Sequence, residues 1–574
     1  MDKLKIIDLF AGAGGLSNGF EQTESFEVVC AVELNGEALE TYQENHKEKS
    51  ILYRQDITTF FPSKEEELAK IPKNELVVVG GPPCQGFSNA NRQKNYLLSG
   101  NNKLVREFVR VIRDLKPVAF LMENVKTMNS DKHKFFATKN GKDTKLLFLK
   151  QYGIEIVKEE IVLAKFRGFP LIKKKIKEFY ESGNWPKPLF HSNEMLSKLR
   201  MIERSIKYKK TISINKKTDH LIFNQMAKQL IEYANKYDIN FESSINLFIE
   251  LSKKGKVKSL ENTDEIIAFI ELNRLLLFIL ELNAEDIDFT IIAEENLIDG
   301  LEIKAVVSSF NVVDYLLKVF DKELGYEVDS NVLTASNYGV PQERKRFMIM
   351  GINREHINGL LNVELPKKLR FIKEPTTVYD AIYSLKNYKP SDKTLDNDSF
   401  DIPLEVRIKS KSKLEKYYTS GFKEFNVSNH VTTESRKTSL KRFEQLEEGQ
   451  NFHNLPDNLK SNYTDVSRTQ NTVYLRLKYD QPSRTVVNVR KSMWIHPEIN
   501  RALSIREAAR LQSFPDSFVF KGKKDSQYQQ IGNAVPPLMA RAVAEAMLKI
   551  LKKEKKRNIE EDLFVKEIVH SLQK

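Results

Sequence analysis

Short, mostly apolar runs recur through the N-terminal part of the chain, and four of the five are followed directly by a small or an acidic residue. The runs are Leu4–Phe10, Phe26–Val32, Ile51–Tyr53, Val77–Val79 and Pro117–Met122. Apolar runs bounded by turn-forming residues are typical of buried strands. A stretch with helical periodicity, Arg106–Leu115, separates the last two runs. Strands that alternate with helices predict an α/β fold with a Rossmann-like sheet.

A glycine-rich turn follows the first run. Phe10 leads into Ala11-Gly12-Ala13-Gly14-Gly15-Leu16, and a helical stretch then continues to about Phe20. Glycines between a strand and a helix let a ligand approach the backbone closely. The spacing differs from the GxGxxG of dinucleotide sites, which argues against a nicotinamide cofactor and therefore against an oxidoreductase.

Acidic residues follow the next two runs. Glu33 ends the second run, where a carboxylate can bind ribose hydroxyls or can simply face solvent at the start of a helix. Asp56 comes shortly after the third run and could accept a hydrogen bond from an adenine amino group. These two carboxylates therefore indicate a possible nucleoside site beside the glycine turn.

The fourth run ends in two glycines and two prolines. Gly80-Gly81-Pro82-Pro83 precede Cys84, which is one of only two cysteines in the chain. Rigid prolines would hold this thiol on a loop at the carboxyl edge of the sheet, where a nucleophile can be presented, although a free structural cysteine is the alternative. Glu123 ends the next strand and would face the same crevice, unless it serves only as a helix cap or a surface acid.

The composition of the chain indicates the kind of partner it binds and the cellular compartment it occupies. The 574 residues suggest three or four domain-sized units, and the net charge of +13 indicates either a nucleic-acid partner or a solvated basic surface. Two cysteines without a CxxC or Cys/His cluster predict reduced thiols and no metal site, which fits the cytoplasm. The longest apolar run, Leu275–Leu280, is too short to cross a membrane, and the N-terminus has no signal-peptide pattern.

Five motifs in a fixed order carry a resemblance to a known family. They are DLFAGAGGL from Asp8, GGPPCQGFS from Gly80, ENV from Glu123, QERKR from Gln342 and QIGNAVPP from Gln530. Together they resemble the ordered motifs of the DNA cytosine-5 methyltransferases of bacterial and phage restriction–modification systems. The resemblance covers roughly 1–130, 308–352 and 470–550. It implies a Rossmann-like methyltransferase domain that depends on S-adenosylmethionine.

The resemblance also divides the chain into segments. The expected segments are 1–130 for the first part of the catalytic domain, 131–308 for an inserted, mostly helical, basic subdomain, 309–352 for the second catalytic part, 353–515 for the target-recognition region, 516–552 for the closing catalytic segment and 553–574 for a charged tail. Within the family, the motif that matches His496–Gln512 usually organises the recognition domain. Helical periodicity covers Phe223–Leu282 in the insertion.

The first part of the insertion is rich in basic residues that would either contact DNA phosphates or form a solubilising face. These residues are Lys173, Lys174, Lys175, Lys177, Arg200, Arg204, Lys207, Lys209, Lys210, Lys216 and Lys217.

The resemblance implies a catalytic role for four residues. Cys84 would attack C6 of a cytosine flipped out of the duplex, and Glu123, with a pKa raised by burial, would neutralise charge at N3. Arg344 and Arg346 lie two apart, so that in a strand they share a face, and one or both would bind O2 and the neighbouring phosphate. The base that removes the C5 proton is left open, with water as one possibility.

The implied methyl donor is S-adenosylmethionine, with S-adenosylhomocysteine as the product and no metal. The residues expected to bind it are Phe10, Ala11, Gly12, Gly14, Gly15, Leu16, Glu33, Leu34, Asp56, Ile57, Pro82, Asn533, Ala534 and Val535. The expected partner is double-stranded DNA, with a cognate restriction endonuclease acting separately. We expect a monomer with no membrane association.

Two alternatives keep the same fold. One branch of the family methylates tRNA, but Gln85-Gly86-Phe87-Ser88 after the cysteine has the form found in the DNA enzymes, and the recognition region is long. A non-catalytic DNA-binding regulator would have lost at least one of the four catalytic residues, and all four are present. The sequence therefore favours a DNA cytosine-5 methyltransferase.

Overall fold

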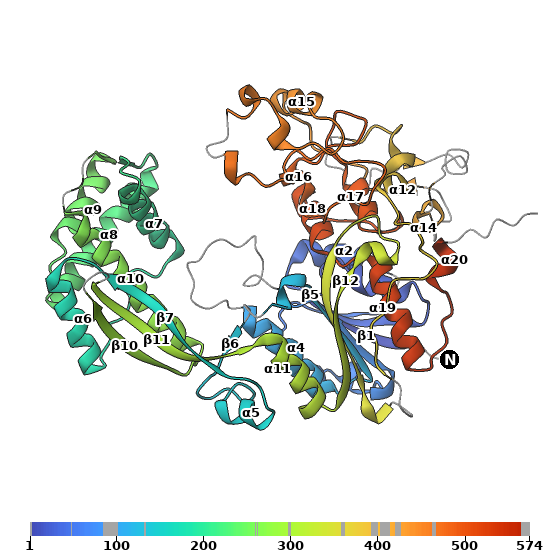
Figure 1. Cartoon of the computed structure of the whole chain (residues 1–574), viewed down its shortest axis with the longest axis horizontal. Helices are drawn as coiled ribbons and strands as arrows, with labels where there is room; N and C mark the ends of the chain where they lie inside the picture. The colour runs from blue at the N-terminus through green and yellow to red at the C-terminus, as the bar shows by residue number, and fades with distance from the viewer. Residues whose placement is uncertain are drawn as a thin grey trace, which may run out of the picture. The chain divides into compact units, whose positions relative to one another are not determined.

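The computed structural model of the chain contains two compact units. It describes residues 3–47, 49–83, 101–130, 134–258, 260, 262–296, 300–356, 362–391, 400–401, 412, 414–419, 426–461 and 466–563. Unit 1 comprises 1–89, 100–130 and 319–574, and unit 2 comprises 90–99 and 131–318 (Figure 1). Cys84 lies outside the described residues, so its predicted role rests on the sequence.

A seven-stranded sheet forms the centre of unit 1. Its strands are β1 (Leu4–Leu9), β2 (Phe26–Val32), β3 (Leu52–Arg54), β4 (Leu76–Gly80), β5 (Ala119–Val125), β12 (Tyr326–Thr334) and β13 (Lys345–Asn353). The order is β12-β13-β5-β4-β1-β2-β3, and β13 runs antiparallel to both of its neighbours. The other neighbouring strands pair in parallel. This arrangement confirms the predicted Rossmann-like α/β fold.

The strand order reverses between β1 and β4. From β1 the chain moves outward to β2 and β3, and it then returns to place β4 and β5 on the other side of β1. Ligands of open α/β sheets bind outside the carboxyl ends of the strands at such a reversal. The glycine turn after β1 and the Gly81–Pro83 segment after β4 therefore begin at the same edge of the sheet.

Unit 1 also contains helices from the parts of the chain that precede and follow unit 2. They include α1 (Gly15–Glu21), α2 (Gly36–Glu44), α3 (Glu66–Ala69), α4 (Asn101–Leu115), α17 (Ile505–Leu511), α18 (Lys524–Asn533), α19 (Pro537–Ile550) and α20 (Ile559–Leu563). A Cβ on Gly19 would lie 2.3 Å from the carbonyl oxygen of Pro537, so only glycine allows α1 and α19 to pack this closely. Ile559 and Asp562 are buried, so α20 is packed against the unit although the sequence predicted a charged tail there.

Unit 2 has a hydrophobic core of its own, with a sheet that the sequence did not predict. The helices expected there are present as α5 (Leu146–Gln151), α6 (Pro170–Ser182), α7 (Asn193–Lys207), α8 (Lys217–Tyr237), α9 (Glu242–Lys254) and α10 (Thr263–Ala284). Antiparallel strands accompany them, namely β6 (Lys134–Phe136), β7 (Val157–Phe166), β10 (Phe289–Asn296) and β11 (Gly300–Asn311), with a short ribbon of β8 (Ile212–Ser213) and β9 (Lys256–Val257).

The boundary of unit 2 also differs from the expected one. The unit extends to Lys318 and so includes α11 (Val312–Lys318), which was predicted as part of the catalytic domain. A π-helical turn, Val319–Glu323, continues α11 into unit 1 and leads to β12. The division between the units therefore falls inside a continuous helical stretch.

The recognition region in unit 1 contains short elements and long connections. Its helices are α12 (Val378–Ile382), α14 (Glu415–Tyr418), α15 (Lys437–Glu444) and α16 (Val489–Ser492), and its strands are β14 (Phe400–Asp401) and β15 (Asn426–Val427). A small separate core joins Phe443, Leu446, Phe452, Leu455, Tyr474 and Ile495. With so few hydrogen-bonded elements, this region depends on buried polar contacts for its shape.

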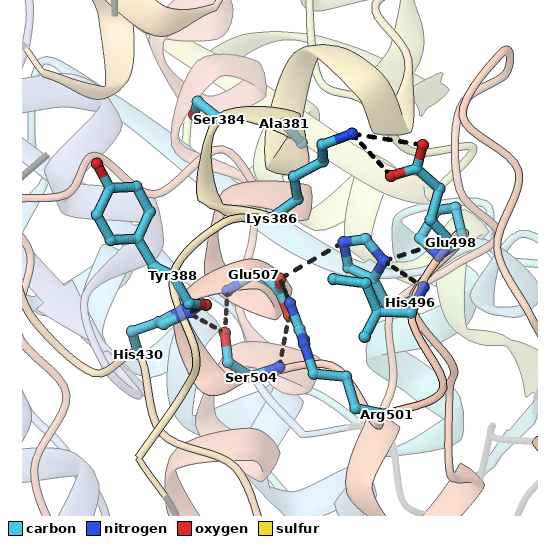
Figure 2. A network of polar contacts seen from close by, with 12 residues as sticks. Ala381, Ser384, Lys386, Tyr388, His430, His496, Glu498, Arg501, Ser504 and Glu507 are labelled. Carbon is cyan, nitrogen blue, oxygen red and sulfur yellow. Dashed lines mark hydrogen bonds and ion pairs between the residues drawn. The ribbon is translucent and has the colours of Figure 1, made fainter. Parts of the chain in front are cut away.

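Figure 2 shows one such network, which surrounds the fully buried Glu507 at the start of α17. Arg501 donates two hydrogen bonds to the Glu507 carboxylate at 2.6 and 2.7 Å, and Ser504 caps the helix by accepting from the Glu507 amide. Arg501 is the main favourable charge that holds the pKa of Glu507 far below its usual range despite burial. A hydrogen bond of 3.0 Å joins His430 Nδ1 to Ser504 Oγ. The network therefore connects α17 to the part of the recognition region that contains His430.

Candidate active site

Glu123 and Arg346 form an ion pair at the carboxyl end of β5. In the antiparallel pairing of β5 and β13, Glu123 lies opposite Met348 and Val125 lies opposite Arg346. Glu123 and Arg346 are therefore diagonal neighbours on one face of the sheet. The Nε atom of Arg346 lies 2.6 Å from Oε1 of Glu123, and Glu123 is buried.

Two opposing effects set the protonation of Glu123. Burial raises the pKa of this carboxyl group, and the positive charge and hydrogen bond of Arg346 lower it, with a net shift upward. A carboxylic acid with a raised pKa keeps its proton to a higher pH than a solvated glutamate does. The arrangement therefore suits a proton donor that faces a developing negative charge.

Arg344 has a different environment from Arg346. Its side chain is completely buried, and its guanidinium donates to the carbonyl oxygens of Val486 and Gly532, each at 2.9 Å. These bonds tie the segment before β13 to the recognition region and to α18. Of the two predicted arginines, only Arg346 forms an ion pair with Glu123.

Gln342, which the sequence reading did not single out, strengthens the same connection. Its amide oxygen accepts from the Val486 amide at 2.7 Å, and its amide nitrogen donates to Gln512 Oε1 at 2.9 Å. Gln512 in turn donates to the carbonyl oxygen of Ile531 at 2.7 Å. Gln342 could have been noticed as the first residue of the QERKR motif. Its buried hydrogen-bond partners are more than 140 residues away in the sequence, so the sequence could not predict them.

The segment that leads toward Cys84 begins directly against Glu123. A Cβ on Gly81 would lie 2.8 Å from Glu123 Oε2, closer than a real Cβ approaches. Asn124, another residue that the sequence reading did not assign, donates from Nδ2 to the carbonyl oxygen of Pro82 at 3.0 Å. The ends of β4 and β5 are therefore held together immediately before the cysteine.

We expect Gly81→Ala to lower kcat/KM by about 10- to 100-fold, because the added methyl group must push the Glu123 carboxylate away from its position. Steady-state kinetics would measure the loss, and the melting temperature would show whether the fold is preserved. Gly36→Ala in α2 is the matched control, since its Cβ would meet no atom within 4 Å. Equal activity of the two variants would contradict a functional contact between Gly81 and Glu123.

The predicted cofactor residues after β1 form a turn with unusual backbone angles. Phe10, Gly12 and Gly14 have φ values of 56°, 56° and 93°. The amide of Gly12 donates to Glu33 Oε2 at 2.8 Å, and the amide of Asn35 donates to Glu33 Oε1 at 2.7 Å. A Cβ on Gly12 would meet nothing within 4 Å, so this side of the turn is open to a ligand.

The closing segment lies against the other side of the same turn. A Cβ on Gly15 would lie 2.5 Å from the carbonyl oxygen of Val535 and 3.2 Å from the Ala534 side chain. Asn533, the last residue of α18, is exposed and accepts from Gln529 at 2.8 Å. Residues from the two ends of the chain, predicted to share one pocket, are therefore in contact.

The remaining predicted cofactor residues follow β2 and β3. Leu34 is 75% exposed, which is unusual for a large apolar side chain and is consistent with a surface that a ligand covers. Asp56 is exposed, and hydrogen bonds from the amide and hydroxyl of Thr58 hold its pKa below the usual value. Ile57 is buried beside it. Leu16 is buried in α1, with its side chain in the core of the unit.

The described residues contain neither a cluster suited to a metal ion nor a helix suited to a membrane. No group of three or more His, Cys, Asp or Glu residues there could hold a metal ion. No described helix is both long and apolar enough to cross a membrane.

Known DNA methyltransferases are similar to this chain in sequence. The family model for C-5 cytosine-specific DNA methylases matches residues 4–170 and 304–549. The type II methyltransferase M1.HphI of Haemophilus parahaemolyticus is 24% identical over 549 residues, which cover 95% of this chain and 87% of that protein. M.AgeI of Thalassovita gelatinovora is also 24% identical, over 555 residues that cover 95% of this chain and 99% of that protein.

A shorter match and a solved structure complete the comparison. The type II methyltransferase M.DdeI of Desulfomicrobium norvegicum is 31% identical over 264 residues, which cover 44% of this chain and 61% of that protein. An E. coli structure described as a prophage-encoded DNA modification methyltransferase aligns with a TM-score of 0.50 at 19% identity, covering 96% of this chain and all of that one, and so supports the fold. The family match extends over more than half of the sequence, and the chain belongs to the C-5 cytosine-specific DNA methylase family.

Proposed function

We propose that this DNA cytosine methyltransferase modifies a flipped-out cytosine through a covalent intermediate on Cys84. The observation that carries the proposal is the Glu123–Arg346 pair, which lies against the segment that leads into Cys84. The C5 and C6 atoms of cytosine must be reached from above and below the ring, so the base has to leave the helical stack.

The proposed reaction has three steps. The Cys84 sulfur bonds to C6, and the electron pair of the C5–C6 double bond moves so that C5 becomes nucleophilic. C5 then forms a bond to the donated methyl carbon, whose bond to the donor sulfur breaks. A base removes the proton from C5, the double bond reforms, the Cys84 thiolate leaves, and a proton received by N3 returns to its donor.

Glu123 and Arg346 suit the electrostatic demands of the first step. Addition of sulfur increases the negative charge at N3 and O2 of the ring. Glu123, with its raised pKa, would donate a proton or hydrogen bond to N3, and the Arg346 guanidinium would donate to O2. Arg344, whose guanidinium already donates to two backbone carbonyls, would act as a positioning residue.

The residues around the glycine turn fit S-adenosylmethionine, which when bound supplies an electrophilic methyl group. The open side of Gly12 leaves room beside the backbone, and Glu33 is held by two amides in a position to accept from ribose hydroxyls. Leu34 would cover the adenine, and Asp56 would accept from its amino group. Phe10 and Pro82 would line the pocket, and Asn533 to Val535 would close it.

The proposed biological role is protection of DNA within a restriction–modification system. Relatives that align over almost the whole chain at 24% identity are type II methyltransferases. In this role the enzyme would act as a monomer in the bacterial cytoplasm. Residues 353–515 would select the DNA sequence, and a separate endonuclease would cut unmodified sites.

Bisulfite sequencing of DNA from cells that express the chain tests this proposal. We expect 5-methylcytosine at one short recurring sequence, and none in cells that express Cys84→Ala at the same level. Methylation confined to tRNA would support the tRNA alternative instead. The absence of methylation in both nucleic acids, from a soluble and folded protein, would contradict the proposed activity.

A further inference from the structure

The lysines of unit 2 differ in their surroundings. Several lysines near its sheet are neutralised by acidic neighbours. The ion pairs are Lys134 with Glu159, Lys165 with Glu302, Lys177 with Glu295, and Lys304 with Glu160 and Glu294. Lys175 of α6 likewise pairs with Glu178. These cations contribute little net charge to the surface.

A second group gathers around the β8–β9 ribbon, and we call its members the ribbon cations. They are Arg204, Lys207, Lys209, Lys210, Lys216, Lys217, Lys253, Lys254, Lys256 and Lys258, and all ten are exposed. Figure 1 shows α7, α8 and α9 together at one end of unit 2, beyond its sheet.

The ribbon brings these residues together from distant parts of the sequence. Ile212 pairs with Val257 and Ser213 pairs with Lys256 in antiparallel register. The amide of Ile214 donates to the carbonyl oxygen of Gly255 at 2.8 Å, which fixes the turn after α9 against β8. The end of α7, the start of α8 and the end of α9 therefore meet at one surface.

Few acidic side chains neutralise the ribbon cations. Within the described residues, Lys254 is the only one of the ten that forms an ion pair, with Glu250. Asp219 lies nearby in sequence but pairs with Lys198. Tyr208 is 51% exposed between two of the cations, with the Nζ atoms of Lys207 and Lys210 at 6.0 and 5.9 Å from its ring centroid. Crowded like charges repel one another, so this surface is suited to a polyanion.

We propose that the ribbon cations bind the phosphate backbone of the DNA substrate independently of its sequence. The inference rests on the family's DNA substrate, which carries about one negative charge per 1.7 Å of duplex. Nine of the ten cations are lysines, which act as point charges and hold phosphates without reading base edges. The ribbon also lies between the two ranges that match the family model, so the surface is an addition to the shared catalytic domain.

The test compares two triple variants of the full-length protein. The first replaces three ribbon cations, as Lys209→Gln, Lys210→Gln and Lys256→Gln. The control makes the same change of charge around α5 of unit 2, as Lys142→Gln, Lys145→Gln and Lys150→Gln, where all three side chains are exposed. Binding to a long duplex of arbitrary sequence is measured at several salt concentrations, and the melting temperatures of both variants are compared with that of the original protein.

We expect the ribbon variant to bind at least 10-fold more weakly at low salt. The slope of its plot of log affinity against log salt concentration should be smaller in magnitude by roughly 2 to 3. Each lost phosphate contact contributes about 0.9 to that slope. The control should change the slope by less than about 1. Single-turnover methyl transfer from fully bound DNA should stay at the original rate.

An unchanged slope for the ribbon variant, or an equal change in the control, would overturn the proposal. Loss of binding to polyglutamate with unchanged DNA binding would also overturn it and would indicate an acidic protein partner. The binding measurement needs no catalysis. If the chain fails to methylate DNA but the slope difference appears, the proposed chemistry is wrong and this inference remains.

Discussion

The Cys84→Ala variant is expected to bind DNA and S-adenosylmethionine with nearly unchanged affinity while its methyl transfer becomes undetectable. Without the sulfur, C5 of cytosine remains a poor nucleophile, and no other group described in the site can add to C6. Transfer of radiolabelled methyl groups to DNA would measure the rate, and calorimetry would measure cofactor binding. Cys30→Ala is the matched control, because the other cysteine is buried in the sheet, where burial raises the pKa of its thiol to about 12.

A substrate that contains 5-fluorocytosine gives a second measurement of the same step. Fluorine cannot leave C5 as a proton does, so the reaction should stop with the base attached to the enzyme. Mass spectrometry should find the adduct on the peptide that contains Cys84. An adduct on another residue, or turnover by Cys84→Ala, would refute the proposed nucleophile.

The Glu123→Gln variant is expected to lower kcat by about 10²- to 10⁴-fold, the usual size of a general acid's contribution. Glutamine keeps the shape of the side chain and can still donate a hydrogen bond, but it cannot transfer a proton to N3. Because the pKa of Glu123 is raised in the folded enzyme, the acid stays protonated to a higher pH, and activity falls as the pH rises through that pKa. That alkaline decline should be absent from the variant.

Rates of methyl transfer measured across pH for both proteins would test this expectation. Glu67→Gln on α3 is the control, since its exposed side chain lies on the surface of the same unit. An alkaline decline of the same position and size in Glu123→Gln would assign the decline to another group. Full activity of that variant would remove Glu123 from the proton transfer.

Sequence alone predicted the sheet because its strands have local patterns. The buried strand β4 has a continuous apolar run, and Glu123 could be placed at a strand end because parallel strands direct their carboxyl ends to one edge. The different roles of Arg344 and Arg346 could not be predicted. Two residues at alternate positions share a face in an ideal strand, but Arg344 precedes β13 and turns toward carbonyls of the recognition region and α18.

The sheet of unit 2 also could not be predicted from local sequence patterns. In β11, Glu302 and Lys304 alternate with apolar residues, and Lys304 is satisfied by glutamates of the neighbouring strands. This strand begins without the continuous apolar run that marks β4, and the long helices of the unit dominate the periodicity. The sequence also did not indicate the full set of ribbon cations. Lys253 to Lys258 are distant in sequence from the others and come close to them only through the β8–β9 pairing.

The contact between Gly15 and Val535 has a consequence for synthesis of the protein. The glycine turn is synthesised before the segment that closes the proposed donor pocket, which lies more than 500 residues later in the chain. A nascent chain therefore cannot complete the donor pocket until α18 and α19 have been made, even if the early strands have already paired. Binding of the methyl donor should thus stabilise only finished molecules, so that newly made enzyme begins to modify DNA after its recognition region is in place.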